Sequence, residues 1–140
     1  MTVLRKDPLL VGSLRYNRLT EKIDVTKVLW WNKEPCVLTN KGRKALRYFF
    51  EKYYGLFNES VMDDALDLEA YSKEYHPICE YLETLEWDGK ERIRNVLKVY
   101  MGADDSDMVY EMLKHFMMGA LNRIYCPGCK FDEMLCLVGP

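Results

Sequence analysis

Apolar residues recur every three or four positions over most of the stretch from Lys41 to Tyr125, and this helical period limits the fold more than any other feature. The strongest part follows Asp104, Asp105 and Ser106, whose side-chain oxygens suit the start of a helix. Its apolar positions are Val109, Met112, Leu113, Phe116, Met117, Ala120, Leu121 and Ile124. The pattern predicts a long helix that ends at the CPGC segment.

Four shorter helices are predicted between residues 41 and 100. We expect them at about residues 41–54, 58 or 60 to 72, 77–85 and 90–100, from the positions of Gly55, of Asn58 or Ser60 as N-cap, of Pro77 and of Gly102. The first forty residues carry turn formers and short alternating runs instead, which predict a β-hairpin between residues 14 and 26. The chain should therefore be mainly α, a helical domain of about five helices with a small N-terminal β-hairpin.

The sequence MLCLVGP at the end of the chain is a short apolar run followed by Gly-Pro. Such a run predicts one C-terminal strand over Met134 to Val138. A buried strand that enters Gly-x-x-x-x-Gly-Lys-Ser/Thr is also how a phosphate-binding P-loop begins, and Gly139 stands where its first glycine would stand. The predicted segments are residues 1–40, which are β-rich, residues 41–133, a helical accessory domain, and residues 134–140, the first strand and start of a truncated P-loop ATPase core.

Two segments, LEWDGKERI at 85–93 and PGCKFDEMLCLVGP at 127–140, resemble the virulence-associated protein E family of phage and genomic-island proteins. The resemblance covers roughly residues 9 to 140. It implies that the chain is the N-terminal accessory portion of a phage or prophage DNA-replication ATPase of the primase-helicase type. This portion would couple the ATPase core to DNA or to neighbouring subunits. The alternative is a free-standing protein-interaction module, a truncated gene product without catalytic activity.

Catalysis depends on residues that would follow Gly139 in the family. The sequence stops at Pro140, before the lysine that neutralises phosphate and the hydroxyl that ligates magnesium. We therefore expect no catalytic residue and no cofactor in these 140 residues, and ATP and magnesium only in a full-length P-loop ATPase or helicase. The expected partners are single-stranded or duplex DNA, a second copy, or a full-length ATPase.

The 20 basic and 22 acidic residues give a formal net charge of −2, so the chain as a whole should not attract a polyanion. A contact with a polyanion would have to be local. Two basic groups are candidates for nucleic-acid contact. The first is Lys90, Arg94 and Lys98, at helical spacing; the second is Lys41, Arg43, Lys44 and Arg47, interleaved with Tyr48, Tyr53 and Tyr54. A stripe of charges is more often a solvated helix face, and both alternatives stay open.

Five cysteines and the lack of a signal-peptide pattern predict a reducing cytoplasm, and no apolar run is long enough to cross a membrane. The Cys126–Cys129 pair has the spacing of half a zinc site, but a structural turn is favoured and no metal is expected. Structural roles are also favoured for His76 and His115. In the WDGKERI segment we expect Trp87 to anchor a core and Asp88 to cap the following helix by accepting a hydrogen bond from the backbone N–H of Lys90 or Glu91.

Overall fold

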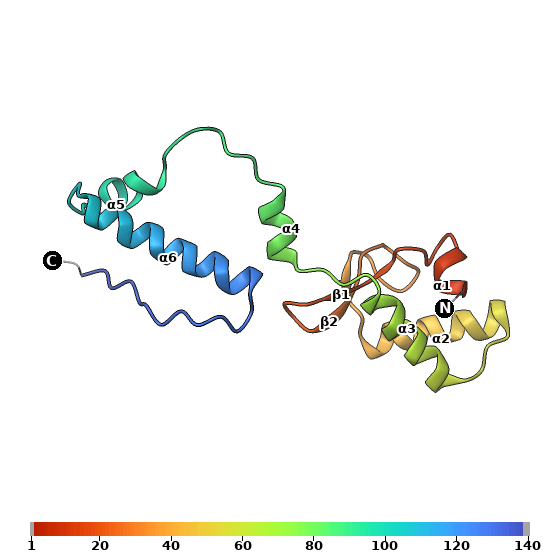
Figure 1. Ribbon diagram of the computed structural model, residues 1–140. Helices are drawn as coiled ribbons and strands as arrows, with labels where there is room; N and C mark the ends of the chain where they lie inside the picture. The colour runs from red at the N-terminus through yellow and green to blue at the C-terminus, as the bar shows by residue number, and fades with distance from the viewer. Residues whose placement is uncertain (1, 139–140) are drawn as a thin grey trace. The chain divides into compact units, whose positions relative to one another are not determined.

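The computed structural model describes residues 2–138, and the chain divides after Glu80 into two compact units, each considered separately (Figure 1). The helices are α1 (Thr2–Lys6), α2 (Asn40–Tyr54), α3 (Glu59–Tyr71), α4 (Pro77–Glu83), α5 (Ile93–Met101) and α6 (Asp107–Tyr125). The strands are β1 (Leu14–Asn17), β2 (Lys22–Val25) and β3 (Cys36–Val37). The predicted mainly α fold with a small hairpin is confirmed, although the division after Glu80 does not coincide with the predicted segments 1–40, 41–133 and 134–140.

The hairpin of the first unit is held by its turn as well as by its ladder. β1 and β2 pair antiparallel with Leu14 opposite Val25, and β3 adds to the free side of β2. At the turn, the side-chain oxygen of Asn17 accepts hydrogen bonds from the backbone N–H groups of Leu19 and Thr20, at 3.0 and 3.2 Å. The sequence did not predict β3 or α1, because two and five residues are too few to show a period.

Local caps set the ends of α2 and α3 at the predicted places. Thr39 caps the start of α2, and Gly55 ends it in the left-handed conformation at φ 63°. The side-chain oxygen of Asn58 accepts from the backbone N–H of Val61 at 3.1 Å and starts α3. The hydrophobic core of this unit is formed by Leu4, Leu10, Leu14, Ile23, Val25, Leu29, Leu46, Phe49, Phe50, Met62, Leu66 and Ala70.

Gly42 allows the segment before α2 to approach that helix closely. A Cβ at this position would lie 2.9 Å from Cδ1 of Leu38 and 3.1 Å from Nε1 of Trp31. The indole of Trp31 therefore packs against the first turn of α2, where only a glycine leaves enough room.

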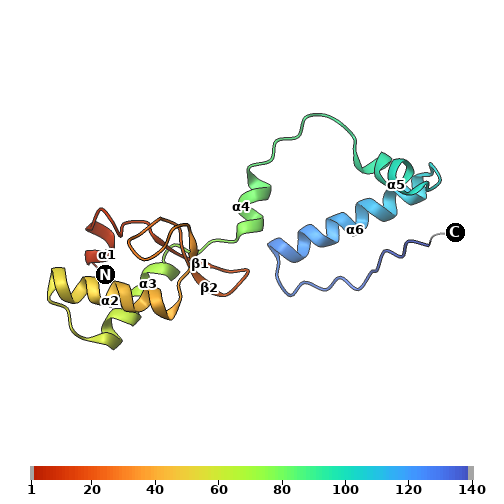
Figure 2. The same ribbon diagram turned by 180° about the vertical axis from the view of Figure 1, so that it is seen from behind.

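The second unit contains α5 and α6. α5 begins at Ile93 and not near residue 90, and Gly89, in the left-handed region at φ 80°, lies in the turn before it. Gly102 ends α5 at φ 67°, and the hydroxyl of Ser106 caps α6 by accepting from the backbone N–H of Val109. After α6 the chain reverses and runs back along that helix (Figures 1 and 2). We call residues 126–138 the tail.

The predicted strand at Met134 to Val138 is wrong for the residues that the structure describes. These residues belong to no helix or strand. A strand needs the backbone of a second strand as its hydrogen-bond partner, and residues 81–138 include none. Gly139, the candidate P-loop glycine, lies outside the described residues.

No helix within residues 2–138 combines the length and the apolar character required to cross a lipid bilayer.

Candidate functional site

The WDGKERI segment forms a turn that is organised by Asp88. Its carboxylate accepts a hydrogen bond from the backbone N–H of Lys90 at 3.2 Å, as predicted. The predicted helix cap is wrong, because α5 begins at Ile93 and its N-cap residue is Arg92. The guanidinium of Arg92 also donates to both carboxylate oxygens, at 2.7 and 2.6 Å. These hydrogen bonds, that of Arg92 above all, lower the pKa of Asp88 to about 2. Trp87 is 79% exposed, so its predicted role as a core anchor is wrong in this structure.

The basic stripe of α5 is largely engaged by acidic residues at the start of α6. Arg94 donates to Asp107 at 2.7 Å, and Lys98 lies 2.7 Å from a carboxylate oxygen of Asp105. These ion pairs connect the two helices of the unit. The turn places Lys90 before the first residue of α5, so the three candidates do not form one stripe on that helix. Nucleic-acid binding by Lys90, Arg94 and Lys98 stays a prediction.

The tail is seated on α6 through Phe131, in the second segment that carries the family resemblance. The ring of Phe131 lies directly over Gly119, where a Cβ would overlap it. The guanidinium of Arg123 donates to the carbonyl oxygen of Phe131, and the His115 ring lies 5.4 Å from the Phe131 ring, centroid to centroid. His115 also lies 3.7 Å from a carboxylate oxygen of Glu133. Gly119 is therefore the position on α6 that lets the tail approach.

The CPGC segment makes the turn between α6 and the tail. The backbone N–H of Cys126 donates to the carbonyl of Asn122 at 2.7 Å, and that of Cys129 donates to the carbonyl of Cys126 at 3.0 Å. Gly128 takes φ 87°, which favours glycine. Across residues 2–138 no three His, Cys, Asp or Glu side chains come together as a possible metal site. The geometry is that of a chain reversal.

The second unit leaves most of its large apolar side chains exposed. Leu97 and Leu113 are its buried apolar side chains among the described residues. The predicted apolar stripe of α6 does form a helix face, but Met112, Phe116, Met117 and Leu121 on it are 39 to 49% exposed. We call these four residues the apolar face. A hollow next to it is lined by residues of α5, α6 and the tail, among them Leu97, Met101, Val109, Met112, Leu135, Leu137 and Val138.

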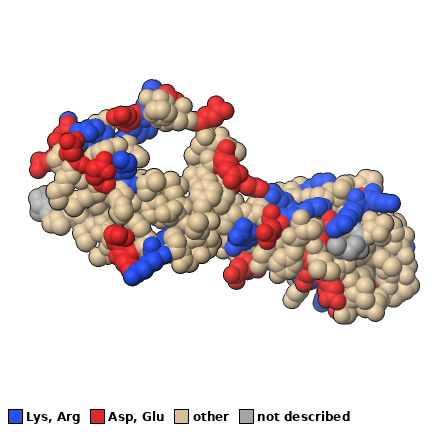
Figure 3. Space-filling model, viewed as in Figure 1, with Lys and Arg blue, Asp and Glu red and all other residues tan. Residues whose placement is uncertain are grey.

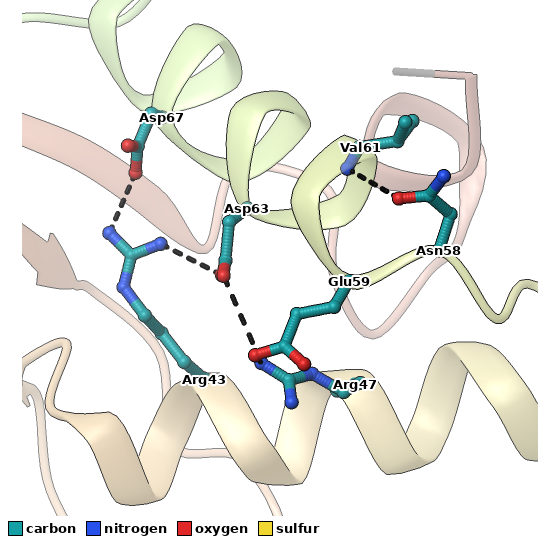
Figure 4. Close-up of polar contacts among 7 residues, drawn as sticks. All are labelled: Arg43, Arg47, Asn58, Glu59, Val61, Asp63 and Asp67. Atoms are coloured by element: carbon teal, nitrogen blue, oxygen red, sulfur yellow. Dashed lines mark hydrogen bonds and ion pairs between the residues drawn. The ribbon is translucent and has the colours of Figure 1, made fainter.

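The second basic group, on α2, is divided by the structure into two sets with different surroundings. Arg43 points toward α3 and donates to Asp63 at 3.1 Å and Asp67 at 2.7 Å (Figure 4). Arg47 points the same way and forms an ion pair with Glu59. Lys41 and Lys44 are exposed, and no ion pair involves them within residues 2–138. Arg43 and Arg47 thus connect α2 with α3, whereas Lys41 and Lys44 face solvent.

An aromatic hollow beside α2 was not predicted from the sequence. Its volume is about 340 Å³, and it is lined by Leu9, Trp30, Tyr48, Phe49 and Tyr53. The Trp30 and Phe49 rings stack with their centroids 4.7 Å apart and an interplanar angle of 26°. The ammonium nitrogen of Lys52 lies 5.6 Å from the centroid of Tyr48 and 5.3 Å from that of Tyr53. The helical spacing of Lys44, Tyr48 and Lys52 could have indicated part of this hollow. Trp30 is too distant from them in the sequence to be recognised as a member of it.

The face of the molecule drawn in Figure 3 has no large surface patch of a single charge sign. Basic and acidic side chains are interspersed on each of the two units (Figure 3). On this face, contact with a polyanion would therefore depend on a small group of residues, in agreement with the net charge of −2.

Comparison with known proteins finds a family model that matches almost all of the second unit. Residues 82–140 match the family model of the virulence-associated protein E-like domain. The resemblance recognised in the sequence is confirmed for this part of the chain, which includes the Asp88 turn, α5, α6 and the tail. No curated protein matches the chain significantly.

Proposed function

Because residues 82–140 match the family model of the virulence-associated protein E-like domain, we propose that the chain is the N-terminal accessory portion of a DNA-replication ATPase of this family. The ATPase would be a phage or prophage primase-helicase. In this role the second unit couples a P-loop ATPase core to DNA or to neighbouring subunits. The ATP and magnesium sites belong to that core, with Gly139 as the first glycine of its phosphate-binding loop.

The exposed apolar face of α6 is the observation that carries the proposal. A helix that presents a row of large apolar side chains is ordinarily covered by another protein surface, because exposure of that row to water is unfavourable. Four such side chains are 39 to 49% exposed here. The second unit buries too few of its own apolar side chains to be stabilised mainly by an internal core.

The position of the tail favours the ATPase core as the covering surface. Residues 134–138 lie in the segment that enters that core in the resembling family, and residues 135–138 line the same hollow as Met112 of the apolar face. A core that follows this segment would therefore start beside the exposed side chains of α6. Burial of those side chains at such a contact would provide a physical link between ATP-driven movement of the core and the second unit.

A binding experiment with an ATPase core tests the proposal. The 140-residue chain is mixed with a separately produced P-loop core of a virulence-associated protein E type protein, and the affinity is measured by calorimetry. Met117→Lys combined with Leu121→Lys should abolish binding, since two charges would be buried at the contact. Asn122→Lys, at an exposed position on the same helix, is the control and should bind like the unmodified chain. Absence of binding, or equal binding by the double variant, contradicts the proposal.

The nucleotide sequence after codon 140 distinguishes the proposed role from its alternative. Codons for a glycine-rich loop that ends in Lys-Ser or Lys-Thr would support an accessory portion joined to its own core. A stop codon at this place, together with binding through the apolar face, would instead identify a free-standing interaction module. A stop codon without any such binding would contradict both functions.

A further inference from the structure

We propose that the outward side of α2 and the neighbouring Trp30 bind single-stranded nucleic acid by stacking its unpaired bases on aromatic rings. We call this surface the aromatic platform, and it consists of Trp30, Tyr48, Tyr53, Lys41, Lys44 and Lys52. It lies in the first unit, outside the residues that match the family model. The inference therefore does not depend on the function proposed for the second unit.

The rings of the platform are exposed and yet supported from below. Trp30 is 47% exposed, Tyr48 61% and Tyr53 62%, and all three line the aromatic hollow. Phe49 is only 8% exposed and forms the floor, stacked with Trp30 and 4.9 Å from the Tyr53 ring. Rings that are fixed by a buried neighbour lose little conformational entropy when a base stacks on them. The hollow thus offers aromatic surface that is already in place for planar ligands.

The lysines of the platform can pair with phosphates. Lys41, Lys44, Tyr48 and Lys52 are spaced by three, four and four residues, which places them along one side of the helix. These lysines take part in none of the ion pairs within residues 2–138, in contrast to Arg43 and Arg47. Glu51 is the nearest acidic residue in the sequence of α2, and it is half-buried. The exposed side chains along this side are therefore cationic and aromatic.

This combination of cationic and aromatic side chains fits a single strand better than a duplex or an apolar protein partner. Each nucleotide of a single strand presents one phosphate and one free base face, and aromatic stacking is tolerant of base identity. A duplex hides its base faces in the stack, so it would use the lysines alone. An apolar partner would have to bury three lysines without an acid to pair with them. The expected ligand is consequently unpaired DNA or RNA with little sequence preference.

Fluorescence anisotropy of the full 140-residue chain with labelled oligonucleotides tests the platform. The first probe is a strand of about 20 thymidines, longer than the roughly 4–16 nucleotides that a single-strand site covers. The second probe is an abasic strand of equal length, and the third is a duplex. We expect the thymidine strand to bind most tightly at low salt, and the abasic strand at least about tenfold more weakly. Equal binding of the abasic strand would show attraction by charge alone and would overturn the proposal.

Variants assign the binding to these residues. Tyr48→Ala should weaken binding of the thymidine strand by about tenfold, in the range found for loss of one stacking ring. Tyr81→Ala removes a ring that is also 62% exposed, outside the platform, and should leave binding unchanged. Lys44→Gln with Lys52→Gln should reduce the slope of log affinity against log salt by about 1.4, because each lysine releases counterions from the strand. Lys114→Gln with Lys130→Gln makes the same charge change in the second unit and should not alter the slope. Equal effects in platform and control variants, or no binding by the unmodified chain, would refute the platform.

Discussion

Gly119→Ala is expected to release the tail from α6 while it strengthens the helix itself. Alanine is better than glycine in a helix interior by about 1 kcal/mol, so α6 alone should gain stability. The added Cβ, however, would occupy the space of the Phe131 ring, which then has to move away. The two effects concern different parts of the unit and can be measured separately.

The cost to the tail can be estimated from the contact that is lost. Full burial of a large apolar side chain contributes about 1.5–3 kcal/mol, and because Phe131 is only half-buried its seat on Gly119 should contribute about 1–2 kcal/mol. The population in which the tail is detached should therefore rise by about 5- to 30-fold. Phe131→Ala removes the same ring contacts and should open the tail to a similar extent. In the Phe131→Ala background, Gly119→Ala should produce no further opening, since the ring that it displaces is absent.

Limited proteolysis with trypsin after Lys130 measures the opening, because cleavage follows the detached population when the tail opens and closes quickly. Helix stability is measured in parallel by circular dichroism during denaturation. Met118→Ala, at the neighbouring exposed position, is the control and should leave cleavage unchanged. The argument is refuted if Gly119→Ala leaves the cleavage rate unchanged, or if it accelerates cleavage as strongly in the Phe131→Ala background.

Three further predictions concern charge and turn formation. Burial by itself raises the pKa of Glu69, but the ion pair with Lys73 and the hydrogen bond from Arg5 outweigh it and lower this pKa, so the stability that the carboxylate contributes should be present above pH 4.5 and lost as the pH falls. Glu69→Gln should cost about 1–3 kcal/mol at pH 7 and flatten this acid dependence in denaturation experiments. Burial and the hydrogen bond to Asp24 raise the pKa of Tyr75 to about 12, so the contribution of its hydroxyl group to folding stability should be complete below pH 10 and lost between pH 10 and 12. Tyr75→Phe should remove this alkaline transition from the ultraviolet phenolate titration. Because CPGC forms a turn, a chelator should leave the melting temperature unchanged, and a lowered melting temperature together with one bound zinc in native mass spectrometry would contradict this.

The helices could be predicted because the signals that start and end them are local. Gly55, Asn58, Gly102 and Ser106 act on the backbone within three residues of their own position, so the order of residues alone locates them. The prediction of a strand at residues 134–138 was wrong for the opposite reason. An apolar run shows only that a segment can form a strand, and the hydrogen-bond partner of that strand has to come from another part of the chain. A sequence signal of two residues was likewise too short for β3.

Long-range contacts in the candidate sites could not be predicted in this way. No role for Gly119 was predicted from the sequence, and only the structure shows that the Phe131 ring lies over it. Trp30 and Phe49 are nineteen positions apart in the sequence, and no spacing rule relates a residue before a helix to one within it. Such contacts depend on how the connecting segments return to the helix, which local propensity does not determine.

The basic group on α2 shows how helical geometry resolves a question that composition leaves open. In the sequence, Lys41, Arg43, Lys44 and Arg47 form one cluster, and the same four residues could bind nucleic acid or stabilise the fold. The helix turns by about 100° per residue, so Arg43 and Arg47, four positions apart, share one side and meet the carboxylates of α3. The same rotation carries Lys41 and Lys44 to the solvent side, in line with Tyr48 and Lys52. Arginine is used where a planar group bridges two carboxylates, and lysine where a mobile cation faces water.

Arg43→Lys should therefore lower the stability of the first unit and leave oligonucleotide binding intact. Lys44→Gln should weaken oligonucleotide binding and leave the stability of the first unit unchanged. If Arg43→Lys weakened binding in a chain of unchanged stability, the separation of the two sides would be wrong.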